Sequence, residues 1–247
     1  MKTALITGGA GELGGATAAR LLAAGWRVAL IDLNEDALSS AAQHLNSEHV
    51  LTVAADVTQA TACAAYAATV ADTWGPIDFF FNNAGIVGKT TSVTDTDEDG
   101  FDRVMDVNVR GVWLGLKYVA PRMRDGGSIV ITSSVAGLRG TPGLFPYTVS
   151  KHAVIGAMRA AALDLAPRQI RVNTVHPAPI AGRMMDELEQ GMTPEDPMIF
   201  REGTVGRIPL GRYVEHDEVA AMVCFLASDE ASAMTGGQFT VDGGFTI

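Results

Sequence analysis

Short apolar segments alternate with longer segments of helical pattern along the whole chain, and this alternation constrains the fold more than any other feature. Strands separated by helix-length segments form βαβ units, whose right-handed crossovers make neighbouring strands parallel. The sequence therefore predicts one α/β domain over residues 1–247, with a doubly wound, mostly parallel sheet of seven strands. The expected strands are residues 4–7, 28–32, 50–55, 77–81, 128–132, 171–176 and 238–241.

Length and charge limit what else the chain can be. At 247 residues it has room for one such domain with a sizeable core, and none for a separate substrate domain. Hydrophobic residues make up 47% and aromatic residues only 6%, which suits a parallel sheet covered by helices of small residues. The net charge of −10 repels phosphate backbones and anionic lipid surfaces, so nucleic acid and membrane are not expected as partners.

Several further features predict a cytoplasmic protein. The opening residues lack the apolar region of a signal peptide, and no apolar run approaches the roughly 20 residues of a membrane span. Cys63 and Cys224 have neither metal-binding nor redox spacing, so both are expected to be reduced structural thiols. No metal site is expected.

Tyr147 and Lys151 form a Tyr-x-x-x-Lys pair, and Ser134 lies thirteen positions before Tyr147. Positions i and i+4 share one face of a helix, so the ammonium is expected beside the phenol. A phenol ordinarily has a pKa of about 10. An adjacent cation lowers this pKa toward the range of a general acid or base. Because a bare Tyr-x-x-x-Lys pair is common on helix surfaces, the prediction of catalysis depends on the other motifs.

Glycine and polar motifs stand where the expected strands end, which is the edge of a doubly wound sheet that binds ligands. A glycine-rich turn follows the first strand, Asp32 ends the second, Asp56 follows the third, and Asn-Asn-Ala-Gly at 82–85 ends the fourth. With these motifs and Asn108, the sequence resembles the short-chain dehydrogenase/reductase family in its compact form. The resemblance runs from Thr7 to Gly244 and implies a Rossmann-type fold and a nicotinamide dinucleotide cofactor.

The resemblance implies a catalytic tetrad of Asn108, Ser134, Tyr147 and Lys151. Tyr147 would exchange a proton with the substrate hydroxyl, and Ser134 would hold the substrate oxygen. Lys151 would lower the pKa of Tyr147 and bind the nicotinamide ribose. Asn108 would hold a water through main-chain and side-chain groups. The alternatives are an ordinary strand-end serine for Ser134 and a helix kink for Asn108.

The glycine turn predicts a pyrophosphate site, because its main-chain N–H groups and the helix that follows attract an anion. Thr7, Gly8 and Gly14 match the family pattern, whereas Glu12 stands where the family has a glycine. The Glu12 side chain would either point toward the pyrophosphate and repel it, or turn to solvent and weaken binding only mildly. The expected contacts in this turn are Gly8, Gly11, Glu12, Leu13 and Gly14.

Asp32 and Leu33 predict NAD as the cofactor, since a carboxylate at this position accepts both ribose hydroxyls and repels a 2′-phosphate. NADP-binding relatives have a basic residue in the glycine turn or directly after this position, and this chain has none at either place. An N-cap role in the next helix is the alternative for Asp32. Asp56 and Val57 are expected to hold the adenine, with a helix cap near Thr58 as the alternative for Asp56.

The remaining cofactor contacts also come from the resemblance. Asn83, Ala84 and Gly85 are expected beneath the adenosine ribose, and Tyr147 and Lys151 beside the nicotinamide. Pro177 and Ile180 belong to a segment that holds the carboxamide of the nicotinamide. Ala178 and Gly182 replace the usual glycine and threonine there, so main-chain contacts from Ile180 are expected to do more.

Five prolines and five glycines interrupt residues 177–212, which predicts a long irregular segment that serves as a substrate lid. His152 and His176 have no partners at catalytic spacing and are assigned to packing. The apolar residues of the lid either line a pocket for a bulky or cyclic apolar substrate or pack the lid onto the domain. These residues are Met184, Met185, Met192, Met198, Ile199 and Phe200.

Together these features predict an NAD-dependent oxidoreductase that interconverts a secondary alcohol and a ketone by direct hydride transfer. One alternative is a 3-oxoacyl thioester reductase, against which Asp32 and the acidic charge weigh. Another is a dinucleotide-sensing protein without turnover, against which the presence of Ser134, Tyr147 and Lys151 weighs. The resemblance also implies a homodimer or homotetramer that pairs the helices following Asp97 and Tyr147.

Overall fold

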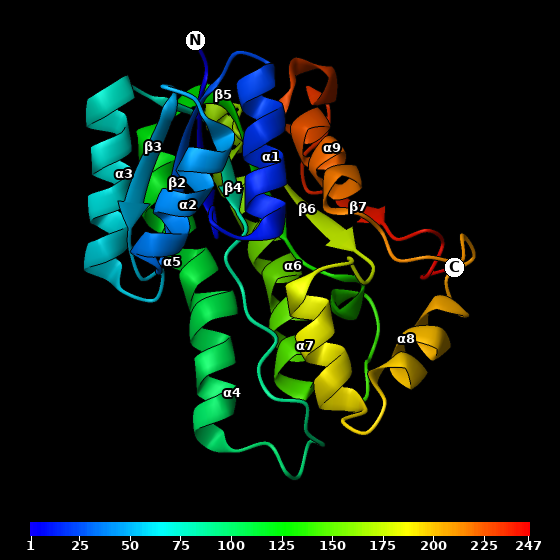
Figure 1. The fold of residues 1–247 in the computed structure, drawn as a ribbon. Coiled ribbons are helices and arrows are strands. Elements are labelled where there is room, and N and C mark those ends of the chain that lie inside the picture. The colour runs from blue at the N-terminus through cyan, green and yellow to red at the C-terminus, as the bar shows by residue number, and fades with distance from the viewer.

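Seven parallel strands form a single sheet in the computed structural model, which describes residues 1–247 (Figure 1). The strand order is β3-β2-β1-β4-β5-β6-β7, so the predicted doubly wound parallel sheet is confirmed. The strands are β1 (Thr3–Thr7), β2 (Arg27–Asp32), β3 (Val50–Ala54), β4 (Ile77–Asn82), β5 (Met123–Thr132), β6 (Arg171–Pro177) and β7 (Gln238–Val241).

One strand differs clearly from its expected bounds. β5 begins at Met123, five residues before the expected start, because Met123 already pairs with Ile77. The register then shifts before Ser128 pairs with Phe79. Gly126, with a φ of 82°, lies within this irregular stretch.

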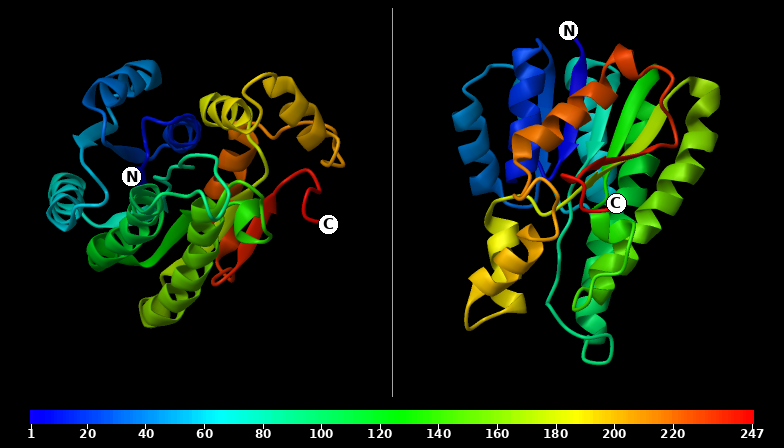
Figure 2. Two further views of the ribbon diagram at one scale, coloured as in Figure 1. Left: turned by 90° about the horizontal axis from the view of Figure 1, so that it is seen from below. Right: turned by 90° about the vertical axis from the view of Figure 1, so that its right-hand side faces the viewer.

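Helices cover both faces of the sheet (Figure 2). α1, α2 and α9 pack on one face, and α3, α5 and α6 pack on the other. The helices are α1 (Glu12–Ala23), α2 (Glu35–Leu45), α3 (Ala60–Trp74), α4 (Glu98–Met105), α5 (Gly111–Val119), α6 (Phe145–Leu165), α7 (Arg183–Met192), α8 (Pro197–Val205) and α9 (His216–Ala227). A π-helical turn, Asp106–Arg110, joins α4 to α5.

The central strand β4 shows how the two apolar layers arise. All six of its residues are buried. Phe79 and Phe81 belong to the apolar cluster beneath α1 and α9, whereas Phe80, between them, belongs to the cluster beneath α3, α5 and α6. Successive side chains of a strand point to opposite faces, so a continuous apolar run supplies both layers at once.

The chain reverses its direction of winding between β1 and β4. Crossovers from β1 lead outward to β2 and β3, and the chain then returns to β4 beside β1. In sheets of this kind ligands bind where the winding reverses, at the carboxyl ends of the strands. These ends face the lower half of Figure 1, where α7, α8 and the start of α6 lie.

Residues 177–212 contain two helices, so the prediction of an irregular segment is wrong. α7 and α8 form because eight of the ten prolines and glycines lie at the ends of these helices or outside them. Gly182 is the N-cap of α7, and Pro197 is the first residue of α8. Asp196 caps α8 by accepting a hydrogen bond from the Met198 N–H at 3.0 Å. Proline at the first helical position costs no hydrogen bond, since that N–H has no partner within the helix.

None of the helices combines the length and the apolar character needed to cross a lipid bilayer.

Candidate active site

The carboxyl ends of β1, β4 and β5 are joined by the side chain of Asn83. Its amide nitrogen donates to the Thr7 carbonyl at 3.1 Å, and its amide oxygen accepts from the Thr132 hydroxyl at 2.9 Å. The Thr7 hydroxyl in turn accepts from the main-chain N–H groups of Asn83 and Ala84. These bonds fix the main chain of the 82–85 motif against the glycine turn.

The glycine turn (residues 8–14) is shaped by close main-chain approaches. Gly8 has a left-handed φ of 66°, and a Cβ there would lie 3.0 Å from the Asn83 amide nitrogen. A Cβ on Gly14 would overlap the Gly8 carbonyl oxygen. Gly11 is the N-cap of α1 and has no side chain to bond the first N–H groups of that helix. Those N–H groups are therefore available to an anion such as a pyrophosphate.

Asp32 lies against the glycine turn. Its carboxylate accepts from the Ala10 N–H at 3.1 Å and from the Leu33 N–H at 2.8 Å. The alternative that Asp32 caps the next helix is wrong, because Asn34 is the N-cap of α2 and accepts from the Ala37 N–H at 2.9 Å. Leu33 is 70% exposed and offers no positive charge. The arrangement suits a ribose with free hydroxyls better than one with a 2′-phosphate.

Asp56 forms a turn with Thr58. Its Oδ1 accepts from both the N–H and the hydroxyl of Thr58, each at 2.8 Å. α3 begins at Ala60 with Gln59 as its N-cap, so Asp56 does not cap that helix. The alternative role for Asp56 is therefore wrong.

Ser134, Tyr147 and Lys151 come together where α6 packs on the short 3-10 turn Val135–Gly137. The Lys151 Nζ lies 5.4 Å from the centre of the Tyr147 ring. Lys151 is 4% exposed and Tyr147 is partly buried. The Ser134 side chain lies near enough to the Tyr147 hydroxyl to lower its pKa. The arrangement can exchange a proton with a hydroxyl or carbonyl oxygen placed between the two hydroxyls.

Burial changes the acidity of both members of the Tyr-Lys pair. It raises the pKa of Tyr147, and the nearby Ser134 side chain opposes that rise. Burial lowers the pKa of Lys151 to about 8. The net shift of the phenol is thus opposite to the lowering expected from the sequence. Desolvation of the phenolate is the larger effect here.

Lys151 has hydrogen-bonding capacity left over. An ammonium has three donors, and the protein uses one of them, in a bond to the Thr132 carbonyl at 2.9 Å. A buried cation with unused donors is costly unless a ligand accepts from it. The site therefore suits a ligand with hydroxyl groups beside Lys151, such as the ribose of a nucleotide.

We expect Lys151→Met to change how stability depends on pH. Between pH 8 and 10.5 the unfolded chain binds more protons at Lys151 than the folded protein does, so this group makes the free energy of unfolding rise with pH. Across that window the free energy of unfolding of the wild type should rise by up to about 3 kcal/mol more than that of Lys151→Met. Denaturant unfolding at both ends of the window measures the difference. Lys117→Met removes an exposed ammonium as a control, and equal slopes for wild type and Lys151→Met would contradict the assignment.

Asn108 lies in the π-helical turn, so the helix irregularity considered for it is present. Its amide oxygen accepts from the Ile86 N–H at 2.8 Å. Its amide nitrogen donates to the Ile86 carbonyl at 2.8 Å and to the Ser150 hydroxyl at 2.9 Å. Both side-chain N–H groups are therefore used within the protein. The expected role of Asn108 in holding a water therefore rests on the second lone pair of its amide oxygen or on its main chain.

His176 contacts the site, although the sequence assigned it to packing. The side chain is fully buried, and its Nδ1 lies 3.0 Å from the Ser134 carbonyl oxygen. The Nε2 atom lies 2.8 Å from the Thr174 hydroxyl. A carbonyl oxygen can only accept, so the Nδ1 atom carries the proton and donates to Ser134. The feature of the sequence that could have indicated this contact is a histidine directly before Pro177, at the end of β6.

Gly137 is a second contributor that sequence reasoning missed. A Cβ at this position would lie 2.5 Å from the Ser133 Oγ and 2.6 Å from the Lys151 carbonyl oxygen. The Ser133 hydroxyl donates to that same carbonyl at 2.9 Å. Gly137 therefore permits the close approach of α6 that brings Tyr147 and Lys151 beside Ser134.

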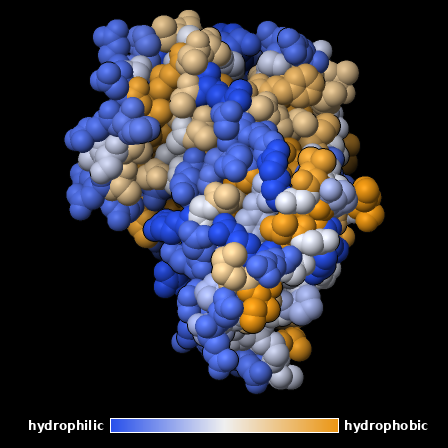
Figure 3. Space-filling view, turned by 45° about the vertical axis from the view of Figure 1, so that its right-hand side comes forward, coloured by the Kyte–Doolittle hydropathy of each residue, from blue (hydrophilic) through white to orange (hydrophobic).

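The apolar residues of α7 and α8 divide into three groups. Met185 is buried in the core and Phe200 packs against it. Met184, Met198 and Ile199 are about half exposed or more, and Figure 3 shows apolar patches among polar ones on this side of the molecule. Met192 differs, because its sulfur would lie 3.3 Å from a Cβ on Gly143, in the loop before α6. Of the six, only Met192 has this contact with a loop that leads into the site.

The expected nicotinamide segment forms main-chain bridges. The Ala178 N–H donates to the Val241 carbonyl, and Ile180 pairs with Val214 in a short parallel bridge. Pro177 ends β6 and is buried. The main chain around Ile180 is thus held in an extended form beside the carboxyl ends of the strands.

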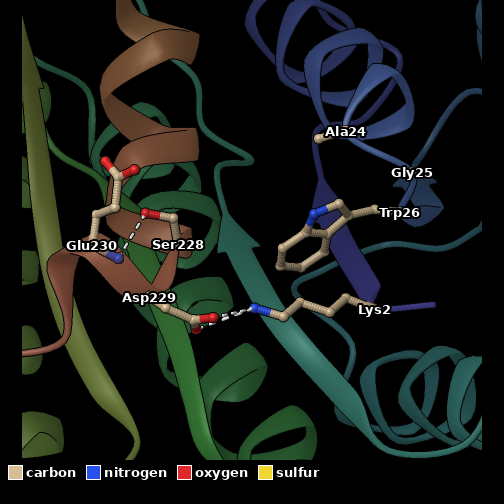
Figure 4. Close-up of a pocket in the computed structure, with 7 residues that line it drawn as sticks. All are labelled: Lys2, Ala24, Gly25, Trp26, Ser228, Asp229 and Glu230. Carbon is tan, nitrogen blue, oxygen red and sulfur yellow. Dashed lines mark hydrogen bonds and ion pairs between the residues drawn. The ribbon is translucent and has the colours of Figure 1, made fainter.

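A hollow of about 500 Å³ lies elsewhere, at the amino-terminal edge of the sheet (Figure 4). It is lined by Trp26 and by Lys2, whose ammonium pairs with Asp229 at 3.1 Å. None of the motifs at the strand ends faces this hollow. Nor does the chain contain a group of three or more His, Cys, Asp or Glu side chains arranged to hold a metal ion.

Comparisons with known proteins identify the class of this protein. The family model described as "Enoyl-(Acyl carrier protein) reductase" matches residues 8–246. Levodione reductase of Leifsonia aquatica is 39% identical, with 98% of this chain and 93% of the relative aligned. An NAD(+)-dependent 2-dehydro-3-deoxy-L-rhamnonate dehydrogenase of Sphingomonas sp. (strain SKA58) is 38% identical over 99% and 95%. The trans-4-hydroxycyclohexanecarboxylate dehydrogenase of Sinomonas cyclohexanicum is 37% identical over 99% and 93%.

Solved structures give the same result. The crystal structure of levodione reductase superposes with a TM-score of 0.95 at 37% identity, covering 98% of this chain and 96% of that one. NAD⁺-bound xylitol dehydrogenase gives 0.93 at 36% identity, covering 98% of each chain. The 3-ketoacyl-(acyl-carrier-protein) reductase of Brucella melitensis, complexed with NADH, gives 0.90 at 30% identity, covering 100% and 98%.

The chain belongs to the short-chain dehydrogenase/reductase family, as the sequence predicted. It is an oxidoreductase that acts on CH–OH groups, and the predicted enzyme class is confirmed.

Proposed function

We propose that this protein is an NAD-dependent dehydrogenase that interconverts a secondary alcohol and a ketone, with Tyr147 as the group that exchanges the proton. The observation that carries the proposal is the convergence of the Tyr147 and Ser134 hydroxyls beside the buried ammonium of Lys151. A relative named as an NAD(+)-dependent dehydrogenase and a similar dehydrogenase structure with bound NAD⁺ support NAD as the cofactor.

The chain's own residues divide the work of proton transfer. Ser134 holds the substrate oxygen. Tyr147 takes the hydroxyl proton during oxidation as the phenolate, and gives a proton back during reduction as the phenol. Lys151, with a pKa of about 8, is protonated at neutral pH and stabilises the phenolate that forms. His176 holds the Ser134 main chain in place through its Nδ1–H. Bound NAD supplies the acceptor for the hydride that leaves the same carbon.

The cofactor would lie along the carboxyl ends of β1 to β6. The glycine turn would hold the pyrophosphate, Asp32 the adenosine ribose, and Asp56 with Val57 the adenine. Asn83, Ala84 and Gly85 would lie beneath the ribose, and Lys151 would bond the nicotinamide ribose with its unused donors. Pro177 and Ile180 would contact the nicotinamide. In the turn, the pyrophosphate contacts would come from Gly8, Gly11, Leu13 and Gly14 and from the main-chain N–H of Glu12, whose side chain instead accepts from the Arg183 N–H.

The proposed substrate is a bulky or cyclic apolar alcohol, and residues 177–212 act as a lid over it. A relative named for a hydroxycyclohexane carboxylate supports a cyclic substrate. Met192 contributes an adaptable apolar surface next to the loop that leads into α6.

Replacement of Asp32 by Ser together with Leu33→Arg is expected to move cofactor preference from NAD toward NADP. The change removes the carboxylate that repels a 2′-phosphate and adds a cation that attracts it. The ratio of kcat/KM for NAD to that for NADP should fall by at least about tenfold, roughly 1.4 kcal/mol. Steady-state kinetics with both cofactors measure it, and Asp36→Ser, at an exposed carboxylate in the first turn of α2, is the control. A wild type that already uses NADP as well as NAD would overturn the assignment of Asp32.

A 3-oxoacyl thioester reductase is the second candidate. It is favoured by the description of the matching family model and by the structural similarity to a 3-ketoacyl reductase. That structure contains NADH, so cofactor preference does not separate the two candidates. A comparison of kcat/KM for a cyclic ketone and for a 3-oxoacyl thioester, both with NADH, does so. A preference for the thioester would favour this second candidate, and no turnover of either compound despite NADH binding would favour a sensor.

We also propose a cytoplasmic homodimer or homotetramer that pairs two helical segments between subunits: the one that follows Asp97, which runs from α4 into α5, and α6. Exposed apolar side chains on these two segments suit such contacts. They are Trp113, Phe145 and Leu163.

A further inference from the structure

We propose that Glu12 is a positioning residue that caps lid helix α7 and holds the start of the lid against the glycine turn. The inference rests on the proposed function only in treating residues 177–212 as a lid. From the sequence, two orientations of Glu12 were open, toward the pyrophosphate or toward solvent. The structure shows a third, in which the carboxylate reaches the segment that begins the lid.

The first contact is a cap supplied from a distant part of the chain. Glu12 Oε2 accepts from the Arg183 N–H at 3.1 Å, although the two residues are 171 positions apart. Arg183 is the first residue of α7, and the N-cap of that helix, Gly182, has no side chain to bond this turn. The first N–H groups of a helix have no partner within the helix, so the carboxylate satisfies a donor that α7 cannot satisfy itself.

The second observation is that Gly182 is shaped to admit this carboxylate. A Cβ on Gly182 would lie 2.5 Å from Glu12 Oε2 and 2.7 Å from His216 Cε1. Gly182 also has a φ of 149°, which residues with a side chain rarely adopt. Glu12 therefore occupies the space in which a side chain at position 182 would begin. These two positions are also departures from the family pattern, and the structure shows them in contact.

Three helices begin around the Glu12 carboxylate. Glu12 is the first residue of α1, Arg183 of α7 and His216 of α9. The amino-terminal end of each helix carries a partial positive charge, so a carboxylate placed among them is stabilised. His216 Nε2 lies 3.7 Å from Glu12 Oε2, beyond hydrogen-bond distance. The direct hydrogen bond to Arg183 is thus the contact that fixes the position of α7.

This arrangement links cofactor binding to lid position. The glycine turn that leads into α1 is the proposed pyrophosphate site. Glu12, the first residue of α1, lies within this turn and supplies the cap of α7. With Glu12 in place, the lid is held at its amino-terminal end before substrate binds. Removal of the cap should increase the population of open lid about fivefold, the change that corresponds to roughly 1 kcal/mol for a lost cap.

Limited trypsin digestion of the whole protein without cofactor tests this proposal independently of turnover. Within the lid, trypsin can cleave after Arg183, Arg201, Arg207 and Arg212. When opening is fast relative to cleavage, the cleavage rate follows the population of the open form. Glu12→Ala should speed cleavage after these residues about fivefold relative to sites outside residues 177–212. Glu12→Gln, whose amide oxygen still accepts from the Arg183 N–H, should stay within about twofold of wild type.

Two further variants separate a specific cap from general destabilisation. Glu35→Ala removes an acidic first residue from α2, which is far from the lid in sequence, and should leave lid cleavage unchanged. Gly182→Ala should speed lid cleavage at least about threefold more in the wild-type background than in the Glu12→Ala background. The clash with the carboxylate exists only in the first background, whereas the clash with His216 and the backbone strain at position 182 are present in both. Faster cleavage at all sites alike, failure of Glu12→Gln to restore the wild-type rate, or independent effects of the two positions would each overturn the proposal.

Discussion

Tyr147→Phe is expected to lower kcat by about 10²–10⁴-fold, because a positioned acid or base contributes this much to proton transfer. The substitution removes only the hydroxyl that lies near Ser134 and leaves the ring beside Lys151. Binding of NADH should therefore change by less than about twofold, since the phenol hydroxyl is one of many contacts to the cofactor. Steady-state rates and fluorescence titration with NADH measure the two quantities.

Tyr118→Phe is the matched control for this prediction. Tyr118 also has a lysine ammonium about as far from its ring, with Lys117 Nζ at 5.3 Å, but it lies on α5 away from Ser134. Its loss should leave kcat unchanged. Retention by Tyr147→Phe of more than about a tenth of the wild-type rate would mean that another group exchanges the proton.

Gly137→Ala is expected to damage both stability and turnover. The added Cβ would lie 2.5 Å from the Ser133 Oγ and 2.6 Å from the Lys151 carbonyl oxygen, both shorter than a van der Waals contact. α6 must therefore move away from the 3-10 turn that holds Ser134. Overpacking of this kind costs about 1–3 kcal/mol. The same displacement separates Tyr147 from Ser134, so kcat should fall by about 10²-fold. Thermal unfolding and steady-state kinetics measure the two effects.

Gly140→Ala provides the comparison within the same loop. A Cβ on Gly140 meets no atom within 4 Å, so this variant should keep wild-type stability and rate. Gly140→Ala lowers the backbone entropy of the unfolded chain by the same amount as Gly137→Ala, so this effect cancels in the comparison. A Gly137→Ala protein with normal turnover would contradict the account of how α6 is placed.

The sequence predicted the sheet well because its strands are marked by local pattern. Apolar runs such as residues 77–81 fill both apolar layers, and the motifs that follow each strand meet at one edge by topology alone. Helices α7 and α8 were missed for a local reason as well. Proline and glycine counts do not distinguish the end of a helix from its interior, and here Gly182, Asp196 and Pro197 are at helix starts.

Parts of the site depended on contacts that no local pattern contains. The hydrogen bond of His176 to the Ser134 carbonyl joins two strand ends, and Glu12 meets Arg183 across most of the chain. The pKa of Tyr147 depends on burial, which the Tyr-x-x-x-Lys spacing does not give. Asp32 and Asn34 are both suitable N-caps by residue type, and only the fold shows that Asn34 takes that position.

Direct transfer of hydride from the substrate carbon to NAD defines the proposed reaction, and isotope labelling of that carbon tests it. A cyclic secondary alcohol carrying deuterium on the carbinol carbon is incubated with the protein and NAD⁺, and the reduced cofactor is examined by mass spectrometry. We expect one deuterium in each molecule of NADH formed by the wild type, and NADH formation at least about 10²-fold slower with Tyr147→Phe. Formation of unlabelled NADH, or the absence of NADH with every secondary alcohol tried although NAD⁺ binds, would contradict the proposed reaction.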